Sequence, residues 1–137
     1  MSILSQSQMD INQLTEQIIA CAYQVHNPLG PGFLEKVYEN ALSIELEQAG
    51  IEVKQQVPIP VRYRGQVVGD FYADLWVADC VIVELKAVRQ LAKEHEVQLA
   101  NYLQATGVED RLLLNFGQSV EVKRKFRTWR SGMKERQ

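Results

Sequence analysis

Hydrophobic residues recur every three or four positions in two stretches near the start of the chain. The first follows Asp10, where the run DINQ has the composition of a capping box, and it ends at the breaker HNPLGPG. A second apolar period covers residues 33–49 and stops at Gly50. The pattern predicts two helices, whose apolar faces carry Ile11, Leu14, Ile18, Ala22 and Val25 in the first and Leu34, Val37, Tyr38, Ala41 and Ile44 in the second.

The pattern then changes to short apolar runs that are typical of strands. Residues 57–77 predict two strands that turn at Arg64 and Gly65, and residues 79–88 predict a third strand after a tight turn at 78–80. A helix at 91–107, a strand at 110–116 and a final strand or frayed extension at 120–129 complete the order. We therefore expect an α/β domain of order α-α-β-β-β-α-β, with or without a last strand.

The composition is typical of one globular domain. Of the 137 residues, 46% are hydrophobic and 23% charged, and no apolar run approaches the ~20 residues that span a bilayer. We expect a single domain over 1–137, with a core at about 10–127, no membrane contact and a cytoplasmic location, because no secretion signal is visible. Cys21 and Cys80 lie in apolar segments and are predicted to be buried thiols.

Charge is distributed unevenly along the chain. The net charge is −2, yet residues 121–137 hold seven basic and two acidic residues. This basic C-terminal tail, which includes Lys123, Arg124, Lys125 and Arg127, and the pair Arg62 and Arg64 at the first hairpin turn concentrate the positive charge that could meet a phosphate backbone. A solvated tail explains the same composition, so both interpretations remain open.

Two carboxylates and an amine interrupt the apolar run DFYADLWVADCVIVELKA at residues 70–87. If the hairpin loop is centred on Asp79, Asp74 lies opposite Glu84 and Tyr72 opposite Lys86. Opposed carboxylates repel, and Mg²⁺ relieves that repulsion because it prefers oxygen ligands. The pattern therefore indicates a metal site, although a surface ion pair of Glu84 with Lys86 and a solubilising Asp74 explain it as well.

Polar residues on two helices extend this candidate site. His95, Gln98 and Tyr102 form one stripe on the predicted helix at 91–107, beside an apolar stripe. On the second helix Glu35 lies one turn before Tyr38. A half-exposed helix explains the stripe, and a first-turn carboxylate that favours the helix dipole explains Glu35, so neither feature decides the function alone.

Several ordered motifs together resemble a known family. GFLEKVY, with Gly32, Glu35 and Tyr38, resembles the signature of the GxxExxY protein family, and the match continues through ADLWV, VIVELKAV, QLANYLQATG and LLLNFG. That family is similar to the PD-(D/E)XK nuclease superfamily. The resemblance implies a restriction-endonuclease-like fold, with a central mixed β-sheet flanked by helices and a site that holds one or two Mg²⁺ or Mn²⁺ ions.

The resemblance also implies roles for individual residues. Asp74, Glu84 and Glu35 would be metal ligands, and Lys86 would be the motif lysine. Gln98 and Tyr102 resemble a Q-x₃-Y element of the helicase-associated exonuclease branch that faces the substrate, and we group Tyr38 with them as a substrate contact. Ala73 occupies the place of the superfamily's nominal proline.

These observations lead to one main hypothesis and two alternatives. The main hypothesis is an Mg²⁺- or Mn²⁺-dependent nuclease that hydrolyses DNA or RNA. The alternatives are a non-catalytic accessory protein that binds nucleic acid or protein, and a hydrolase of a small phosphodiester. Homodimer formation and the choice between DNA and RNA remain open.

Overall fold

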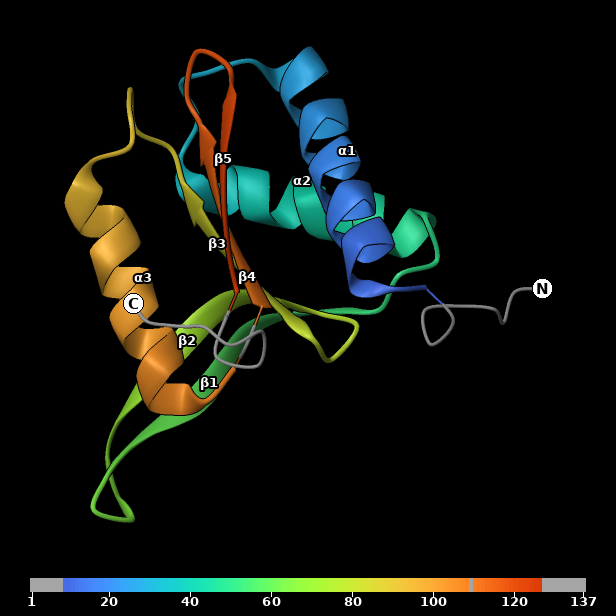
Figure 1. Cartoon of the computed structure of the whole chain (residues 1–137). Helices are drawn as coiled ribbons and strands as arrows, with labels where there is room; N and C mark the ends of the chain where they lie inside the picture. The colour runs from blue at the N-terminus through green and yellow to red at the C-terminus, as the bar shows by residue number, and fades with distance from the viewer. Residues whose placement is uncertain (1–8, 109, 127–137) are drawn as a thin grey trace.

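The computed structural model describes residues 9–108 and 110–126, without the side chains of residues 102, 103, 105, 106 and 126. The helices and strands follow the predicted order, and the last segment is a strand (Figure 1). In chain order they are α1 (Ile11–Leu29), α2 (Glu35–Gln48), β1 (Val53–Tyr63), β2 (Gln66–Val77), β3 (Val81–Lys86), α3 (Lys93–Thr106), β4 (Asp110–Phe116) and β5 (Val120–Phe126).

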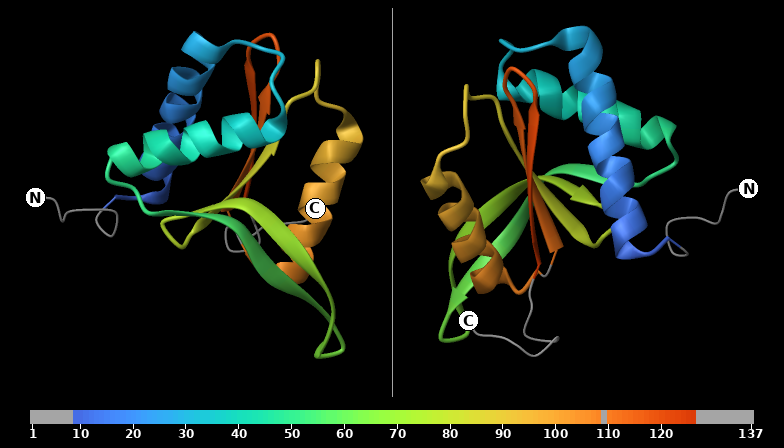
Figure 2. Two further views of the ribbon diagram at one scale, coloured as in Figure 1. Left: turned by 180° about the vertical axis from the view of Figure 1, so that it is seen from behind. Right: turned by 45° about the horizontal axis from the view of Figure 1, so that its top comes forward.

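The five strands form one mixed sheet. Its spatial order is β1-β2-β3-β4-β5, and neighbours are antiparallel except for the parallel pair β3 and β4. Helix α3 makes the crossover that a parallel pair requires. Helices α1 and α2 lie on one side of the sheet and α3 on the other (Figure 2). This architecture confirms the predicted fold class, a central mixed sheet flanked by helices.

The core has two parts, one on each face of the sheet. The larger part joins α1 and α2 to the sheet residues Leu75, Val77, Val83, Leu85, Leu112, Leu114 and Phe116. The smaller part joins Leu99 of α3 to Phe71, Ala73, Ile82 and Leu113. Because side chains alternate along β3, Glu84 and Lys86 lie on the same face as Ile82, toward α3.

Helix α1 begins as its sequence predicts. The Asp10 carboxylate accepts a hydrogen bond from the Gln13 N–H at 2.8 Å, and the Gln13 side chain accepts one from the Asp10 N–H at 3.1 Å. These reciprocal bonds satisfy two N–H groups that the first turn leaves unpaired. The helix ends at Leu29, and Gly30 follows with a φ of 71° that glycine adopts readily.

The predicted apolar face of α2 is partly wrong. Tyr38 is buried as expected, but Leu34, Val37 and Ile44 are exposed, and the buried stripe instead continues through Leu42 and Leu46. Leu34 is the N-cap residue and lies outside the helix. The i, i+4 spacing of 38, 42 and 46 turns this stripe toward the sheet, with Ala41 partly buried beside it, whereas Val37 and Ile44 face solvent.

The hairpin between β2 and β3 has the predicted register. Leu75, Trp76 and Val77 pair with Val83, Ile82 and Val81 across a three-residue loop. The prediction that Cys80 is buried is wrong, because Cys80 lies in this exposed turn, whereas Cys21 is buried as predicted. The basic C-terminal tail beyond Phe126 lies outside the described residues.

In the described part of the chain, none of the helices combines the length and the apolar character needed to cross a bilayer.

Candidate active site

The candidate site lies where the backbone ladder between β2 and β3 ends. The last ladder pair is Leu75 with Val83, so Asp74 and Glu84 are the next residues on the two strands. The Leu85 N–H donates to Oδ2 of Asp74 at 2.8 Å, and the Asp74 N–H donates to Oε1 of Glu84 at 3.3 Å. Beyond the last pair, each carboxylate therefore accepts a hydrogen bond from the backbone of the opposite strand. These two bonds hold the acids close together.

Both carboxyl groups have raised pKa values. Burial raises the pKa of Glu84 from its usual 4.5 to about 8, and repulsion from Asp74 adds to the shift. Burial also raises the pKa of Asp74, which the hydrogen bond from Leu85 partly opposes. Lys86 lowers both pKa values, but not enough to restore the usual ones. Burial therefore outweighs the charge of Lys86 at both carboxyl groups.

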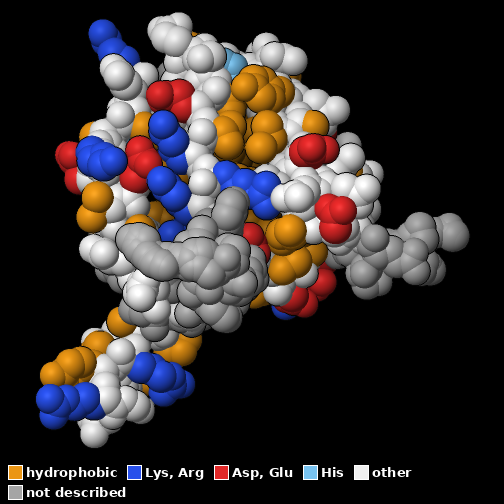
Figure 3. All heavy atoms as spheres, in the orientation of Figure 1, with side chains coloured by type: hydrophobic (Ala, Val, Ile, Leu, Met, Phe, Trp, Pro, Cys, Tyr) orange, Lys and Arg blue, Asp and Glu red, His pale blue; other side chains and the backbone are white. Residues whose placement is uncertain are grey.

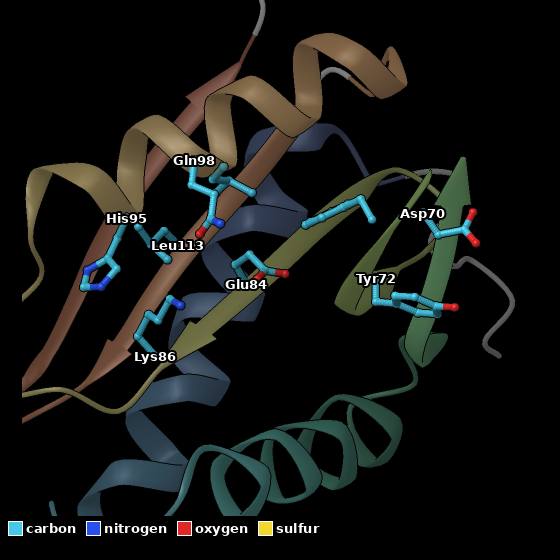
Figure 4. Close-up of a pocket in the computed structure, with 9 residues that line it drawn as sticks. Asp70, Tyr72, Glu84, Lys86, His95, Gln98 and Leu113 are labelled. Atoms are coloured by element: carbon cyan, nitrogen blue, oxygen red, sulfur yellow. The ribbon is translucent and has the colours of Figure 1, made fainter. Parts of the chain in front are cut away.

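A pocket of about 160 Å³ opens beside these acids, between the sheet and α3. Glu84 and Lys86 line it from β3, Asp70 and Tyr72 from β2, and His95 and Gln98 from α3 (Figure 4). The structure thus brings Glu84, Lys86 and Gln98 to one pocket. Tyr72 and Lys86 share this pocket, but the ladder ends before it would pair them.

His95 adds a ring nitrogen to this pocket. The Ala92 N–H donates to Nδ1 of His95 at 3.0 Å. The neutral ring therefore carries its proton on Nε2, which leaves a hydrogen-bond donor on the other side of the ring. Tyr102 lies in α3 as predicted, but its side chain is outside the described residues.

Two acidic residues in the first half of α2, Glu35 and Glu39, differ in their environment. Glu35 is exposed in the first turn, and its charge makes the smallest contribution to the raised pKa of Glu84. Glu39, one turn later, is only 3% exposed, and its carboxylate accepts hydrogen bonds from Lys36, Gln55 and Gln56 at 3.1, 2.8 and 3.0 Å. Its charge also raises the pKa of Asp74.

Gln56 connects this helix to the candidate site. Its side-chain amide donates to Glu39 and to Oδ1 of Asp74, both at 3.0 Å. Its φ of 51° is uncommon for a residue other than glycine and interrupts the pairing of β1 with β2 opposite Asp74. The sequence prediction missed both Glu39 and Gln56, because a glutamine in a polar run and a glutamate on a helix give no periodic signal.

Tyr38 occupies a structural position. Its side chain is fully buried, its ring stacks on Phe116 with centroids 4.6 Å apart, and its hydroxyl donates to the Gly30 carbonyl at 2.6 Å. The Phe33 N–H donates to the same hydroxyl at 3.2 Å. The predicted substrate contact by Tyr38 gains no support from this position, where the side chain joins the α1–α2 connection to the sheet.

The donor set at the ladder end fits a divalent cation. Asp74 and Glu84 are hard oxygen ligands, and burial raises the pKa values of both, so a bound cation would stabilise their ionised forms. Among the described residues, no three His, Cys, Asp or Glu side chains are grouped closely enough to hold a metal ion. Glu35 thus does not complete a preformed group of three acids here.

Comparison with known proteins identifies the family. A family model described as the PD-(D/E)XK nuclease superfamily matches residues 12–127, which is most of the chain. Searches of curated proteins and of solved structures found no significant match. The chain belongs to the PD-(D/E)XK nuclease superfamily.

Proposed function

We propose that this PD-(D/E)XK domain is a divalent-metal-dependent nuclease that hydrolyses phosphodiester bonds in DNA or RNA. One observation carries the proposal: Asp74 and Glu84 meet at the end of the β2–β3 ladder, both with raised pKa values, beside a pocket that Lys86 also lines. Two neighbouring buried acids, whose ionised forms repel each other, are suited to a cation, and a lysine beside them is suited to an anionic phosphate.

Asp74 and Glu84 would hold Mg²⁺ or Mn²⁺, and Glu35 would approach as a third ligand from the first turn of α2. When bound, such an ion polarises the scissile phosphate and lowers the pKa of a water molecule.

The other pocket residues would bind and orient the substrate. The Lys86 side chain would orient the attacking water or help to remove a proton from it. The Gln98 amide and the Nε2–H of His95 are hydrogen-bond donors that would bind phosphate oxygens from the α3 side of the pocket. Tyr102, one turn after Gln98, would stack on a nearby base or sugar.

The test is cleavage of labelled single- and double-stranded DNA and RNA, with small phosphodiesters in parallel, in the presence of Mg²⁺ or Mn²⁺. Wild type is compared with Glu84→Gln and with Glu16→Gln, the same chemical change at an exposed position on α1. We expect wild type and Glu16→Gln to cleave a nucleic acid and Glu84→Gln to lose at least a hundredfold in rate.

Two other results would support one of the alternative functions instead. Cleavage of small phosphodiesters alone would identify a hydrolase of small molecules. Equal and negligible metal affinity of wild type and Glu84→Gln, measured by calorimetry with nucleic acid present, would contradict catalysis and favour an accessory binding protein.

A further inference from the structure

The β1–β2 hairpin extends well beyond the helices that cover the sheet (Figure 1). We call its distal part, residues 61–69, the arm. From Arg62 to Gly69 every residue of the arm is exposed. Within the described chain, only Val61 at the base of the arm packs against the core under α3, so the side chains of residues 62–69 are available to another molecule.

The arm combines positive charge with exposed apolar side chains. It contains Arg62 and Arg64 and no acidic residue, and Tyr63, Val67 and Val68 are 62%, 53% and 63% exposed. Neither arginine forms a salt bridge with a described residue, and the Arg64 guanidinium lies 5.4 Å from the centre of the Tyr63 ring. Basic and hydrophobic side chains gather together at the end of the projecting hairpin in Figure 3.

This combination matches the chemistry of nucleic acids. Arginine binds phosphate oxygens, and an exposed tyrosine ring or a valine can contact unstacked bases or sugars. A positively charged arm on a chain of net charge −2 also orients an anionic polymer toward one end of the molecule.

The outer edge of the hairpin is unsuited to pairing with a strand of a second copy. Strand β1 is the edge of the sheet, and it carries Pro58 and Pro60, which have no N–H to donate to another strand. Both prolines lie just before the arm and limit strand pairing there, so the choice of a nucleic acid rests on the exposed arginines and tyrosine of the arm itself.

Strand β2 links the arm to the candidate active site. It runs from Gln66 at the turn to Asp74, and Asp70 and Tyr72 between them line the pocket. The eight steps from residue to residue between Gln66 and Asp74 span about 27 Å, and at about 3.4 Å per base pair this length corresponds to about eight base pairs.

We propose that the arm binds the backbone of a nucleic acid about eight base pairs from the phosphate that lies at the candidate active site. Arg62 and Arg64 contact phosphates, and Tyr63, Val67 and Val68 contact the sugars and bases between them. The choice of a nucleic acid rests on the proposed nuclease function, but the contact itself needs no cleavage.

Binding is measured by fluorescence anisotropy with the full chain in EDTA, which prevents metal-dependent cleavage. The probes are labelled single-stranded DNA, duplex DNA and RNA of about 30 nucleotides, at several salt concentrations. Wild type is compared with Arg62→Gln/Arg64→Gln and with the matched control Lys54→Gln/Lys93→Gln, which removes two exposed charges outside the arm.

We expect the arm variant to bind at least tenfold more weakly than wild type, and the control to bind as wild type does. The salt dependence should also change: for duplex DNA, the slope of log K against log[salt] should fall by about 1.8, since each lost phosphate contact removes about 0.9. Tyr63→Ala should weaken binding to single strands with little change in this slope, because stacking releases no counterions.

The outcomes separate the arm from the nuclease activity. If wild type binds nucleic acid in EDTA and the arm variant binds equally well, the arm proposal is overturned while cleavage is unaffected. Failure of wild type to bind any probe would overturn it too. If the arm variant loses binding and wild type cleaves no substrate, the arm proposal is supported and the proposed nuclease function is contradicted. Sedimentation of both proteins distinguishes a further result. If wild type is a dimer, the arm variant is a monomer and both bind nucleic acid equally, the arm is a contact between two copies of the chain and the proposal is overturned.

Discussion

Oδ2 of Asp74 accepts the backbone N–H of Leu85 at 2.8 Å, one residue beyond Glu84 on the neighbouring strand. A side chain thus satisfies a strand N–H that the β2–β3 ladder does not reach. Asp74 therefore has two roles that a mutation can separate: its oxygen stabilises the strands, and its charge suits it to bind a cation.

Asp74→Asn and Asp74→Ala separate these roles. Asparagine keeps an oxygen that accepts the Leu85 N–H but removes the charge, so we expect a folded protein that loses metal affinity and activity. Alanine removes the acceptor too and should lower the free energy of unfolding by a further ~1–3 kcal/mol. Urea denaturation and metal titration check both expectations. Equal stability of the two variants would contradict the structural role of the oxygen.

The raised pKa of Glu84 makes folding depend on pH. Between its usual pKa of 4.5 and its folded pKa of about 8, the folded chain retains a proton that the unfolded chain has lost. The free energy of unfolding therefore falls as pH rises through this window. Glu84→Gln cannot titrate, so in EDTA wild type should lose on the order of 2–5 kcal/mol more than the variant between about pH 5 and pH 8.5. Parallel pH profiles in urea denaturation would contradict the burial of this carboxyl.

Metal binding should release a proton. At pH 7 the Glu84 carboxyl is mostly protonated, because its pKa is about 8, and a metal ligand must be ionised. Calorimetry in buffers of different ionisation enthalpy should show close to one proton released per metal ion at about pH 7 and far less at about pH 9. The absence of this difference would show that Glu84 is not a ligand.

Tyr38→Phe tests the role of the buried tyrosine. The mutation removes a hydroxyl that donates to the Gly30 carbonyl and accepts the Phe33 N–H. Because both partners lose a hydrogen bond, the free energy of unfolding should fall by ~1–3 kcal/mol. The apparent affinity for substrate, measured as KM, should stay unchanged. A raised KM with unchanged stability would instead support a substrate contact.

Gly117→Ala tests the loop that follows Lys86. A Cβ atom at Gly117 would lie 2.9 Å from the Val88 carbonyl oxygen and 3.0 Å from that of Arg89. Asn115 holds Val88 by hydrogen bonds to its N–H and its carbonyl, both at 2.9 Å, so this backbone cannot yield easily. We expect a loss of ~1–3 kcal/mol in stability. Gly69→Ala is the matched control, since a Cβ atom there meets nothing within 4 Å.

Local features were readable from the sequence. The capping box at Asp10 depends on residues three positions apart, and the breaker after His26 ends α1 near the predicted place. The pairing of β2 with β3 follows from the length of one turn, and the same turn length predicts that Asp74 lies opposite Glu84. Ordered motifs along most of the chain were sufficient to indicate the superfamily.

Features that depend on distant segments were not readable. Helix periodicity alone does not say which of two apolar stripes on α2 meets the sheet, so Leu34, Val37 and Ile44 were misplaced. The link from Glu39 through Gln56 to Asp74 joins a helix and two strands across residues that are 17 and 18 positions apart, beyond the reach of any local pattern. The exposure of Cys80 follows from its place in a turn rather than from its apolar neighbours.

The sequence by itself therefore determined the order of helices and strands, and it predicted the hairpin register and the pair of acids for one assumed turn length, because short-range hydrogen bonds and turn lengths specify them. Only the tertiary structure decided that burial raises the pKa of Glu84, that the Tyr38 hydroxyl is bonded to Gly30 and Phe33 and that the arm projects free of the helices. The physical reason is that burial and charge balance at one side chain depend on every layer packed around it, and those layers come from distant parts of the chain.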